Sequence, residues 1–157
     1  MKNTSCAIFI ESKAEKTFLL CHATNTKHWS LPKGVFDKDE DSTFLEAAVR
    51  EVREETGIEI HDTWNVSFVD KFNYHPEKDL VIYYYQIDNE IPINELKCKS
   101  YFMDVYSSRL KPEVDNYVWE NFDNIKTNVS KKQLEILKSK YFIKRIKMIR
   151  DSYNDNN

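Results

Sequence analysis

Three glutamates, Glu51, Glu54 and Glu55, recur at intervals that gather them on one side of a helix. Successive helical residues are rotated by about 100°, so Glu55 falls within the apolar stripe and Glu51 at its border. Carboxylates beside a core lose solvation and repel one another, and a hard cation such as Mg²⁺ relieves both costs. The alternative is an exposed charged run stabilised by pairs such as Arg50 with Glu54. The spacing alone leaves both interpretations open.

The glutamates need a rigid element to hold them, and the apolar pattern predicts a helix at 43–56. Ser42 or Thr43 is suited to cap its start, and Gly57 to end it. Alternating apolar residues predict extended segments at 5–12, 16–23, 28–34, 63–72, 80–87, 100–106 and 117–122.

The remaining chain predicts one α+β domain spanning residues 1–150. A second helix is predicted at 130–150 with Ser130 as its cap, and residues 73–79 are predicted to form a loop. No repeat or linker divides the chain. The tail 151–157 is predicted to be disordered.

Composition limits the kinds of ligand. A net charge of -3 gives no general attraction for DNA or for an anionic membrane, so phosphate groups must be held by a local site or a metal ion. With two glycines, the chain has no Gly-rich phosphate loop. The three cysteines lack CxxC spacing, and no apolar run approaches the ~18 residues of a membrane span. The sequence therefore predicts a soluble, cytoplasmic protein with reduced thiols.

The stretch "LPKGVFDKDEDSTFLEAAVREVREETGIEI" resembles the Nudix box, the strand-loop-helix signature of the Nudix hydrolases. The usual box is a Gly, five residues, a Glu, seven residues, then Arg-Glu-aliphatic-any-Glu-Glu-any-Gly-aliphatic. The second half is complete at 50–58, and Gly34 and Glu40 fit the first half. Nine residues separate Glu40 from Arg50, however, instead of seven. Either the loop carries a two-residue insertion or Ser42 occupies the usual Glu position.

The resemblance implies a Nudix fold, an α/β/α sandwich around a mixed sheet. It also implies hydrolysis of a nucleoside diphosphate linked to a further group X, with Mg²⁺ or Mn²⁺ as cofactor. Glu51, Glu54, Glu55 and Gly34 would form the metal site, with Glu54 also catalytic. Arg50 would orient a glutamate through a charge-assisted hydrogen bond.

Segments outside the box resemble the diadenosine tetraphosphate (Ap4A) hydrolase branch of the family. "HWSLPKG" is similar to that branch's W-x-x-P-K-G lead-in, which implies that His28 and Lys33 meet the phosphate chain. "LKPEVDNYVWENF" is similar to a segment in which a Glu precedes a Trp by six residues. That Glu is Glu113, which becomes a candidate metal ligand or general base, with Glu120 in reserve.

The nucleobase of such a substrate needs an aromatic platform. The candidate rings are Tyr74, Tyr83, Tyr84, Tyr85 and Tyr117. Because side chains alternate between the two faces of a strand, most of "YYY" is expected to pack within the fold. Tyr83 or Tyr85 is the preferred candidate for the platform. Lys78 would add a phosphate contact.

Several functions remain open beside Ap4A hydrolysis. Within the family these are cleavage of ADP-ribose, NADH, FAD or the RNA 5′ cap. The "SQPWPFP"-like segment expected of NADH-type members is absent. A diphosphoinositol polyphosphate would need a dense basic patch around the mouth of the site. The basic segment "KSKYFIKRIKMIR" could provide it, and its alternative role is the solvated face of a helix. A catalytically silent nucleotide-binding domain would be expected to lose box glutamates, which this chain keeps. A small nucleotide is thus the expected partner, a 5′ RNA end is possible, and monomer and homodimer stay open.

Overall fold

The computed structural model describes residues 2–155, and its centre is a seven-stranded mixed sheet. The strands follow the order β3-β2-β1-β6-β5, while β4 pairs with β1 and β9 with β2. Strand β1 runs parallel to β6, and the other pairs are antiparallel. The strands of this sheet are β1 (Asn3–Ser12), β2 (Thr17–Ala23), β3 (Trp29–Ser30), β4 (Lys33–Val35), β5 (Ser67–His75), β6 (Lys78–Ile87) and β9 (Val114–Asn121).

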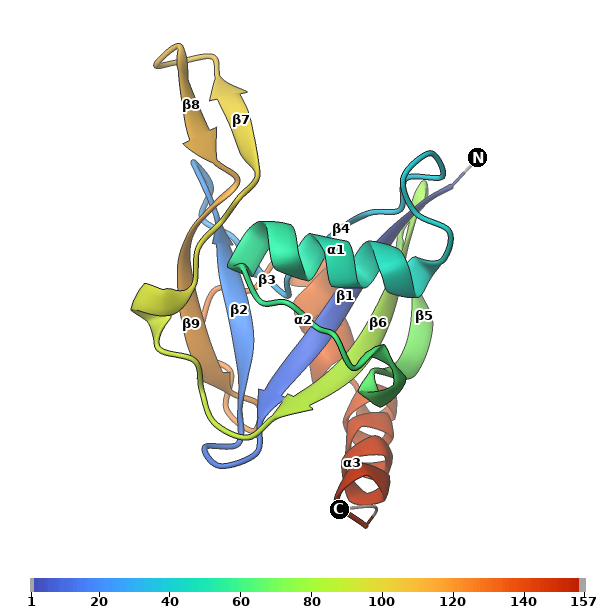
Figure 1. Cartoon of the computed structure of the whole chain (residues 1–157). Coiled ribbons are helices and arrows are strands. Elements are labelled where there is room, and N and C mark those ends of the chain that lie inside the picture. The colour runs from blue at the N-terminus through green and yellow to red at the C-terminus, as the bar shows by residue number, and fades with distance from the viewer. Residues whose placement is uncertain (1, 156–157) are drawn as a thin grey trace.

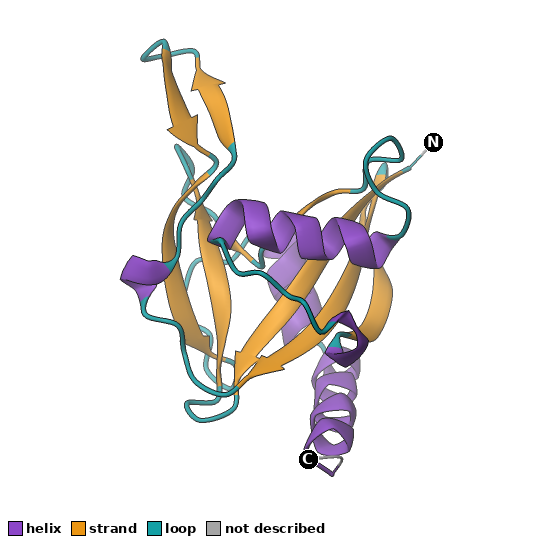
Figure 2. Cartoon of the chain, viewed as in Figure 1, coloured by secondary structure: helices purple, strands orange, loops and turns teal. Residues whose placement is uncertain are grey.

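Helices cover both faces of this sheet (Figures 1 and 2). The helices are α1 (Phe44–Thr56), α2 (Lys131–Lys138) and α3 (Lys140–Asp155), with short 3-10 turns at Thr63–Asn65 and Ile93–Glu95. Alternate residues of β1 point to opposite faces. Ile8 packs in the core that contains Val52 of α1, whereas Phe9 packs in the core that contains Phe142 of α3. The predicted α+β class and sandwich around a mixed sheet are confirmed.

Helix α1 begins and ends as its capping residues predict. The Thr43 side chain accepts a hydrogen bond from the backbone N–H of Glu46 at 3.1 Å. Gly57 adopts φ 79°, a left-handed conformation that favours glycine, and its N–H donates to the carbonyl of Arg53 at 2.9 Å. The box helix therefore has fixed ends.

The strands differ from prediction at their margins. Residues 63–65 form a 3-10 turn, so the strand predicted from 63 begins at Ser67. The loop predicted at 73–79 shrinks to a tight turn, because β5 continues to His75 and β6 starts at Lys78. Strand β9 starts at Val114, earlier than predicted. The strand predicted at 100–106 is β7 (Tyr101–Asp104), which pairs with the unpredicted β8 (Arg109–Pro112) in a hairpin that projects from the body (Figure 1).

The C-terminal segment is two helices, where one was predicted. Ser139 breaks the run with extended backbone torsions, φ -66° and ψ 144°, and its hydroxyl accepts from the N–H of Phe142 at 3.1 Å. Ser130 precedes α2, but within residues 2–155 its side chain makes no capping bond.

Helix α3 is fixed to the sheet by an ion pair. Arg150 donates to both oxygens of the buried Glu11, at 2.8 and 2.6 Å. The helix continues to Asp155, so the predicted disorder of 151–155 is wrong, and 156–157 lie outside the described residues. No helix within residues 2–155 has the length and apolarity to cross a bilayer.

Candidate active site

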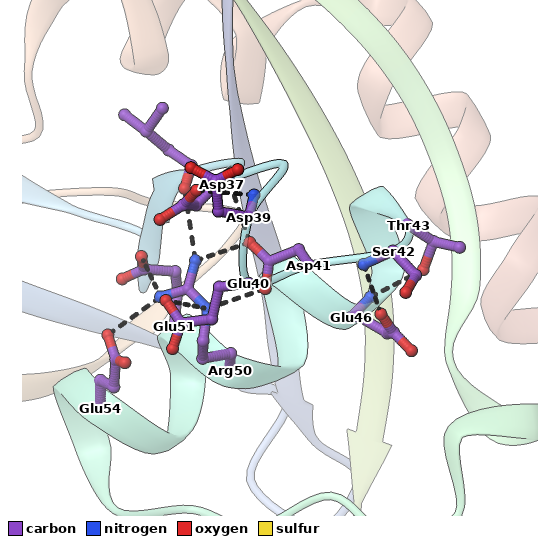
Figure 3. Close-up of polar contacts among 11 residues, drawn as sticks. Asp37, Asp39, Glu40, Asp41, Ser42, Thr43, Glu46, Arg50, Glu51 and Glu54 are labelled. Atoms are coloured by element: carbon purple, nitrogen blue, oxygen red, sulfur yellow. Dashed lines mark hydrogen bonds and ion pairs between the residues drawn. The ribbon is translucent and has the colours of Figure 1, made fainter.

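Arg50 organises the acidic side of α1 (Figure 3). Its Nη1 donates to Oε1 of Glu51 at 3.0 Å and to Oε2 of Glu54 at 3.2 Å. Its other nitrogens, Nε and Nη2, each donate to an oxygen of Asp41 at 2.8 Å. One guanidinium therefore holds two glutamates on the same helix side in defined positions, as charge-assisted hydrogen bonds do.

Asp41 is a site residue that sequence reasoning missed. From the incomplete first half of the box, either Glu40 or Ser42 was predicted to occupy the usual Glu position. Glu40 is exposed and lies 3.8 Å from Nε of Arg50, whereas the Asp41 side chain is 2% exposed. Ser42 instead donates its backbone N–H to Glu46 at 2.7 Å.

The bidentate pair with Arg50 lowers the pKa of Asp41 below its usual value. The acid-rich run "DKDED" was the available signal. Residue counting failed because the altered loop length changes which acid turns inward.

Gly34 and Glu51 are in close contact. A Cβ at Gly34 would lie 1.9 Å from Cδ of Glu51, so any larger residue here would displace the Glu51 carboxylate. Burial raises the pKa of Glu51 to about 7, against the opposing effect of Arg50, and Glu54 and Glu113 add to the rise. The close approach brings β4 and Glu51 of α1 together.

Glu55 is held by the backbone of the lead-in segment. The N–H of Lys33 donates to Oε1 of Glu55 at 2.9 Å. Burial raises the pKa of this carboxyl to about 8, opposed by the Lys33 hydrogen bond, and Glu51 and Glu113 add further to the rise. Ionising both neighbouring carboxyls, Glu51 and Glu55, is thus costly. A divalent cation would favour the form in which both are ionised.

Glu113 reaches the same region from the β8–β9 junction. Its carboxylate is exposed and close enough to raise the pKa of both Glu51 and Glu55. Its backbone is fixed by an N–H bond to Ser100 O at 2.9 Å and by a bond from Thr24 N at 3.0 Å. A second chain segment therefore supplies an acid beside the helix.

Glu120, the reserve candidate, has a structural role in the structure. Its Oε2 accepts the N–H groups of Lys126 at 3.1 Å and Thr127 at 2.8 Å. The Thr127 hydroxyl also donates to it. These bonds hold the loop before α2.

The donor set fits a hard divalent cation by its chemistry. Glu51, Glu54 and Glu55 offer carboxylate oxygens within about one helical turn, the ligands that Mg²⁺ and Mn²⁺ prefer. Within residues 2–155, no three His, Cys, Asp or Glu side chains are already arranged around a metal position.

A cationic pocket of about 280 Å³ lies at the tip of the β5–β6 hairpin and the start of α2. We call it the Tyr74 pocket, and it is lined by Tyr74, His75, Lys78, Ser130 and Lys132. The Tyr74 hydroxyl lies 3.4 Å from the Ser130 hydroxyl. Nζ of Lys33 lies 6.0 Å from the Tyr74 ring centroid. Lys33 therefore connects this pocket to Glu55 through one residue.

Sequence reasoning located this pocket only in part. Lys78 was predicted to contact phosphate, and Tyr74 was a candidate ring without being preferred. His75, Ser130 and Lys132 were missed, because they come from segments that only the fold brings together. His28, a predicted phosphate contact, lies on the exposed loop before β3 and does not line the pocket.

The preferred tyrosines have packing roles. Tyr83 and Tyr85 are half-buried against the core beneath α1, and the Tyr85 hydroxyl donates to Asp62 at 2.6 Å. Tyr117 is 8% exposed, and its hydroxyl donates to the carbonyl of Glu55 at 2.6 Å. Packing therefore occupies part of each of these rings, and their role as the nucleobase platform stays a prediction. Tyr117 also supports the end of the acidic helix.

The fold and the acid-bearing helix define a Nudix domain, and sequence comparison agrees. The family model described as NUDIX domain matches residues 1–140. The chain belongs to the Nudix family.

One sequence relative and two solved structures resemble the chain. The chain is 31% identical over 105 residues to an uncharacterized 17.7 kDa protein from the e-segB intergenic region of Enterobacteria phage T4, covering 66% of this chain and 65% of that protein. The NUDIX domain of Shewanella oneidensis NrtR, solved with ADP ribose, matches with TM-score 0.67 and 12% identity over 93% of this chain and 89% of that one. A C. elegans Ap4A hydrolase in a binary complex matches with TM-score 0.64 and 19% identity over 94% and 98%. These structural likenesses establish the fold.

Proposed function

We propose that the chain is a divalent-metal-dependent pyrophosphohydrolase that cleaves a dinucleoside polyphosphate such as Ap4A by water attack. The observation that carries the proposal is the contact of Lys33 with both parts of the site. Its N–H holds Glu55 at 2.9 Å, and its ammonium group lies by the ring of Tyr74. A polyphosphate bound between them would meet carboxylates at one end and cations at the other.

The acids have separable tasks in this mechanism. Glu51, Glu54 and Glu55 would hold a divalent ion, which would screen the charge of the pyrophosphate and lower the pKa of the attacking water. Arg50 keeps Glu51 and Glu54 oriented, and Lys33 does so for Glu55. Glu54 and Glu113 are the less enclosed carboxylates, and one of them accepts the proton of the water.

The Tyr74 pocket supports a polyphosphate with an aromatic base. Tyr74 presents a ring for stacking, while Lys78 and Lys132 line the same pocket and Lys33 flanks it. Three lysines around one small pocket suit more negative charge than a single phosphate carries. The chain as a whole carries net charge -3, so this local concentration sets the pocket apart.

ADP-ribose is the second candidate. It carries the same adenosine and pyrophosphate units, so it would use the same stacking ring and acids, and the Shewanella domain with this fold was solved with it. NADH and FAD share those units. A 5′-capped RNA instead carries a methylated guanosine on a triphosphate bridge, which is also a nucleoside on a polyphosphate, so all three belong in the same test.

A diphosphoinositol polyphosphate is less well supported. Arg145 donates to the carbonyls of Phe68 and Val69, and Arg150 pairs with Glu11. These two cations of the C-terminal basic segment thus stabilise the fold and do not form a phosphate-binding patch.

The test is hydrolysis of a substrate panel by the purified chain with Mg²⁺ or Mn²⁺. Ap4A, ADP-ribose, NADH, FAD, a dNTP and 5′-capped RNA would be compared, and products resolved by chromatography with and without EDTA. We expect Ap4A to be converted to ATP and AMP, with loss of turnover in EDTA. Faster turnover of ADP-ribose or capped RNA would replace the substrate assignment, and no turnover of any compound would favour a binding role.

A further inference from the structure

A second and larger recess opens on the other side of the acids. It has a volume of about 710 Å³ and lies between the start of β1, the segment after β4 and the start of α1. We call it the loop cleft. Arg50 and Glu51 line it, so it begins at the acid cluster itself. Its volume is within the range of about 300–1,000 Å³ typical of small-molecule sites.

The lining of the loop cleft suits a neutral, hydroxyl-rich aromatic group. Phe36 and Phe44 meet edge to face with ring centroids 5.1 Å apart, and both line the cleft beside the 44% exposed Val35. The charged residues of the lining are four acids and three bases, so the cleft is slightly acidic: Asp37, Asp39, Glu40 and Glu51 with Lys2, Lys38 and Arg50. Carboxylates repel phosphate but accept hydrogen bonds from ribose hydroxyls and base amino groups. A nucleoside has both features.

The loop cleft and the Tyr74 pocket lie on opposite sides of β4. Tyr74 packs against the core that α2 and α3 cover, and Lys33 lies over its ring. The next residue, Gly34, contacts Glu51, and Phe36 packs against Phe44 at the start of α1. Lys33, Gly34 and Phe36 therefore face the Tyr74 pocket, the acids and the loop cleft in turn.

We propose that the loop cleft binds the second nucleoside of a two-ended substrate, while the Tyr74 pocket binds the first and the polyphosphate crosses the acids between them. This inference rests on the proposed function and deepens it. It assigns recognition of the second end to Phe36, Phe44 and the acidic loop after β4. A substrate that lacks a second nucleoside would leave the loop cleft unused.

The test obstructs the loop cleft and compares two substrates. Asn3 and Lys38 are exposed residues that line it, so Asn3→Trp and Lys38→Trp would each place a bulky ring at its rim. We expect each variant to raise KM for Ap4A by about two- to tenfold, the loss of one aromatic contact. KM for adenosine 5′-tetraphosphate, which has one nucleoside, should stay unchanged.

Asn89→Trp is the matched control, because Asn89 is exposed and follows the end of β6 farthest from Asn3. It should alter neither substrate. Equal effects of both cleft variants on the two substrates, or no effect on either, would overturn the inference while leaving Ap4A hydrolysis in place. If the wild-type chain cleaves adenosine tetraphosphate but not Ap4A, the proposed function itself fails.

Discussion

The acidic side of α1 and the Tyr74 pocket lie beside the same residue, Lys33, yet they are built in different ways. The acids come from one helical turn, are partly enclosed, and are oriented by Arg50 and by a backbone N–H. The pocket combines a hairpin tip with the start of α2 and keeps exposed cations such as Lys78. Fixed acids suit a chemical step that many substrates share. An assembled pocket suits selection among those substrates.

Removal of one acid should have the largest effect. Glu54→Gln keeps the shape and removes the charge, so we expect kcat to fall by about 10²–10⁴-fold for every substrate that is cleaved. The urea unfolding midpoint should change little, because the Glu54 side chain is 32% exposed. Glu95→Gln, an exposed carboxylate on the second 3-10 turn, is the control. Wild-type turnover in Glu54→Gln would show that catalysis does not depend on the Glu54 carboxylate.

Loss of the ion pair between Arg50 and Asp41 should have the next largest effect, on stability. Asp41→Asn would leave a buried guanidinium without its bidentate partner, and we expect about 3 kcal/mol lower stability in urea unfolding. Glu40→Gln should have almost no effect, since that side chain is 57% exposed. The reverse order of the two variants would mean that Glu40 fills the box position.

The raised pKa values of Glu51 and Glu55 predict that the stability of the metal-free protein depends on pH. Glu51 and Glu55 have pKa values of about 7 and about 8 in the fold, above their usual 4.5. The folded chain thus holds more protons than the unfolded chain between about pH 4.5 and 8. Its stability should fall as pH rises through that window, by at most about 1.4 kcal/mol per pH unit for each group. Thermal unfolding in EDTA from pH 5 to 8.5 would measure it, and a stability that rises with pH would contradict it.

A substitution in the Tyr74 pocket should have a smaller effect, and it should change KM instead of kcat. Lys78→Ala removes an exposed cation, so we expect KM for Ap4A to rise about three- to tenfold with kcat unchanged. Lys13→Ala, at the turn after β1, serves as the control. A loss of kcat instead would place Lys78 in the chemical step and remove the distinction between the two regions.

The same contrast explains what could be predicted from the sequence. Glu51, Glu54 and Glu55 lie within five residues of one another, so helical periodicity alone placed them together, and Thr43 and Gly57 fixed the ends of their helix. Tyr74, Ser130 and Lys132 meet only after β5 and α2 pack together, and no local pattern records that packing. Asp41 escaped because the length of its loop differs from the usual one, and only the fold shows which acid turns inward. Tyr83 and Tyr85 are half-buried against the core, and strand alternation alone does not separate aromatic residues that pack from those that bind.

The most direct test of this division of tasks is the steady-state kinetics of Tyr74→Ala with Ap4A. The Tyr74 ring lines the pocket beside Lys33 and is not part of the acidic side of α1. The account predicts a raised KM with kcat close to wild type, because the acids and their orienting bonds stay in place. A fall in kcat at unchanged KM would contradict it and would show that the pocket and the acids act as one unit.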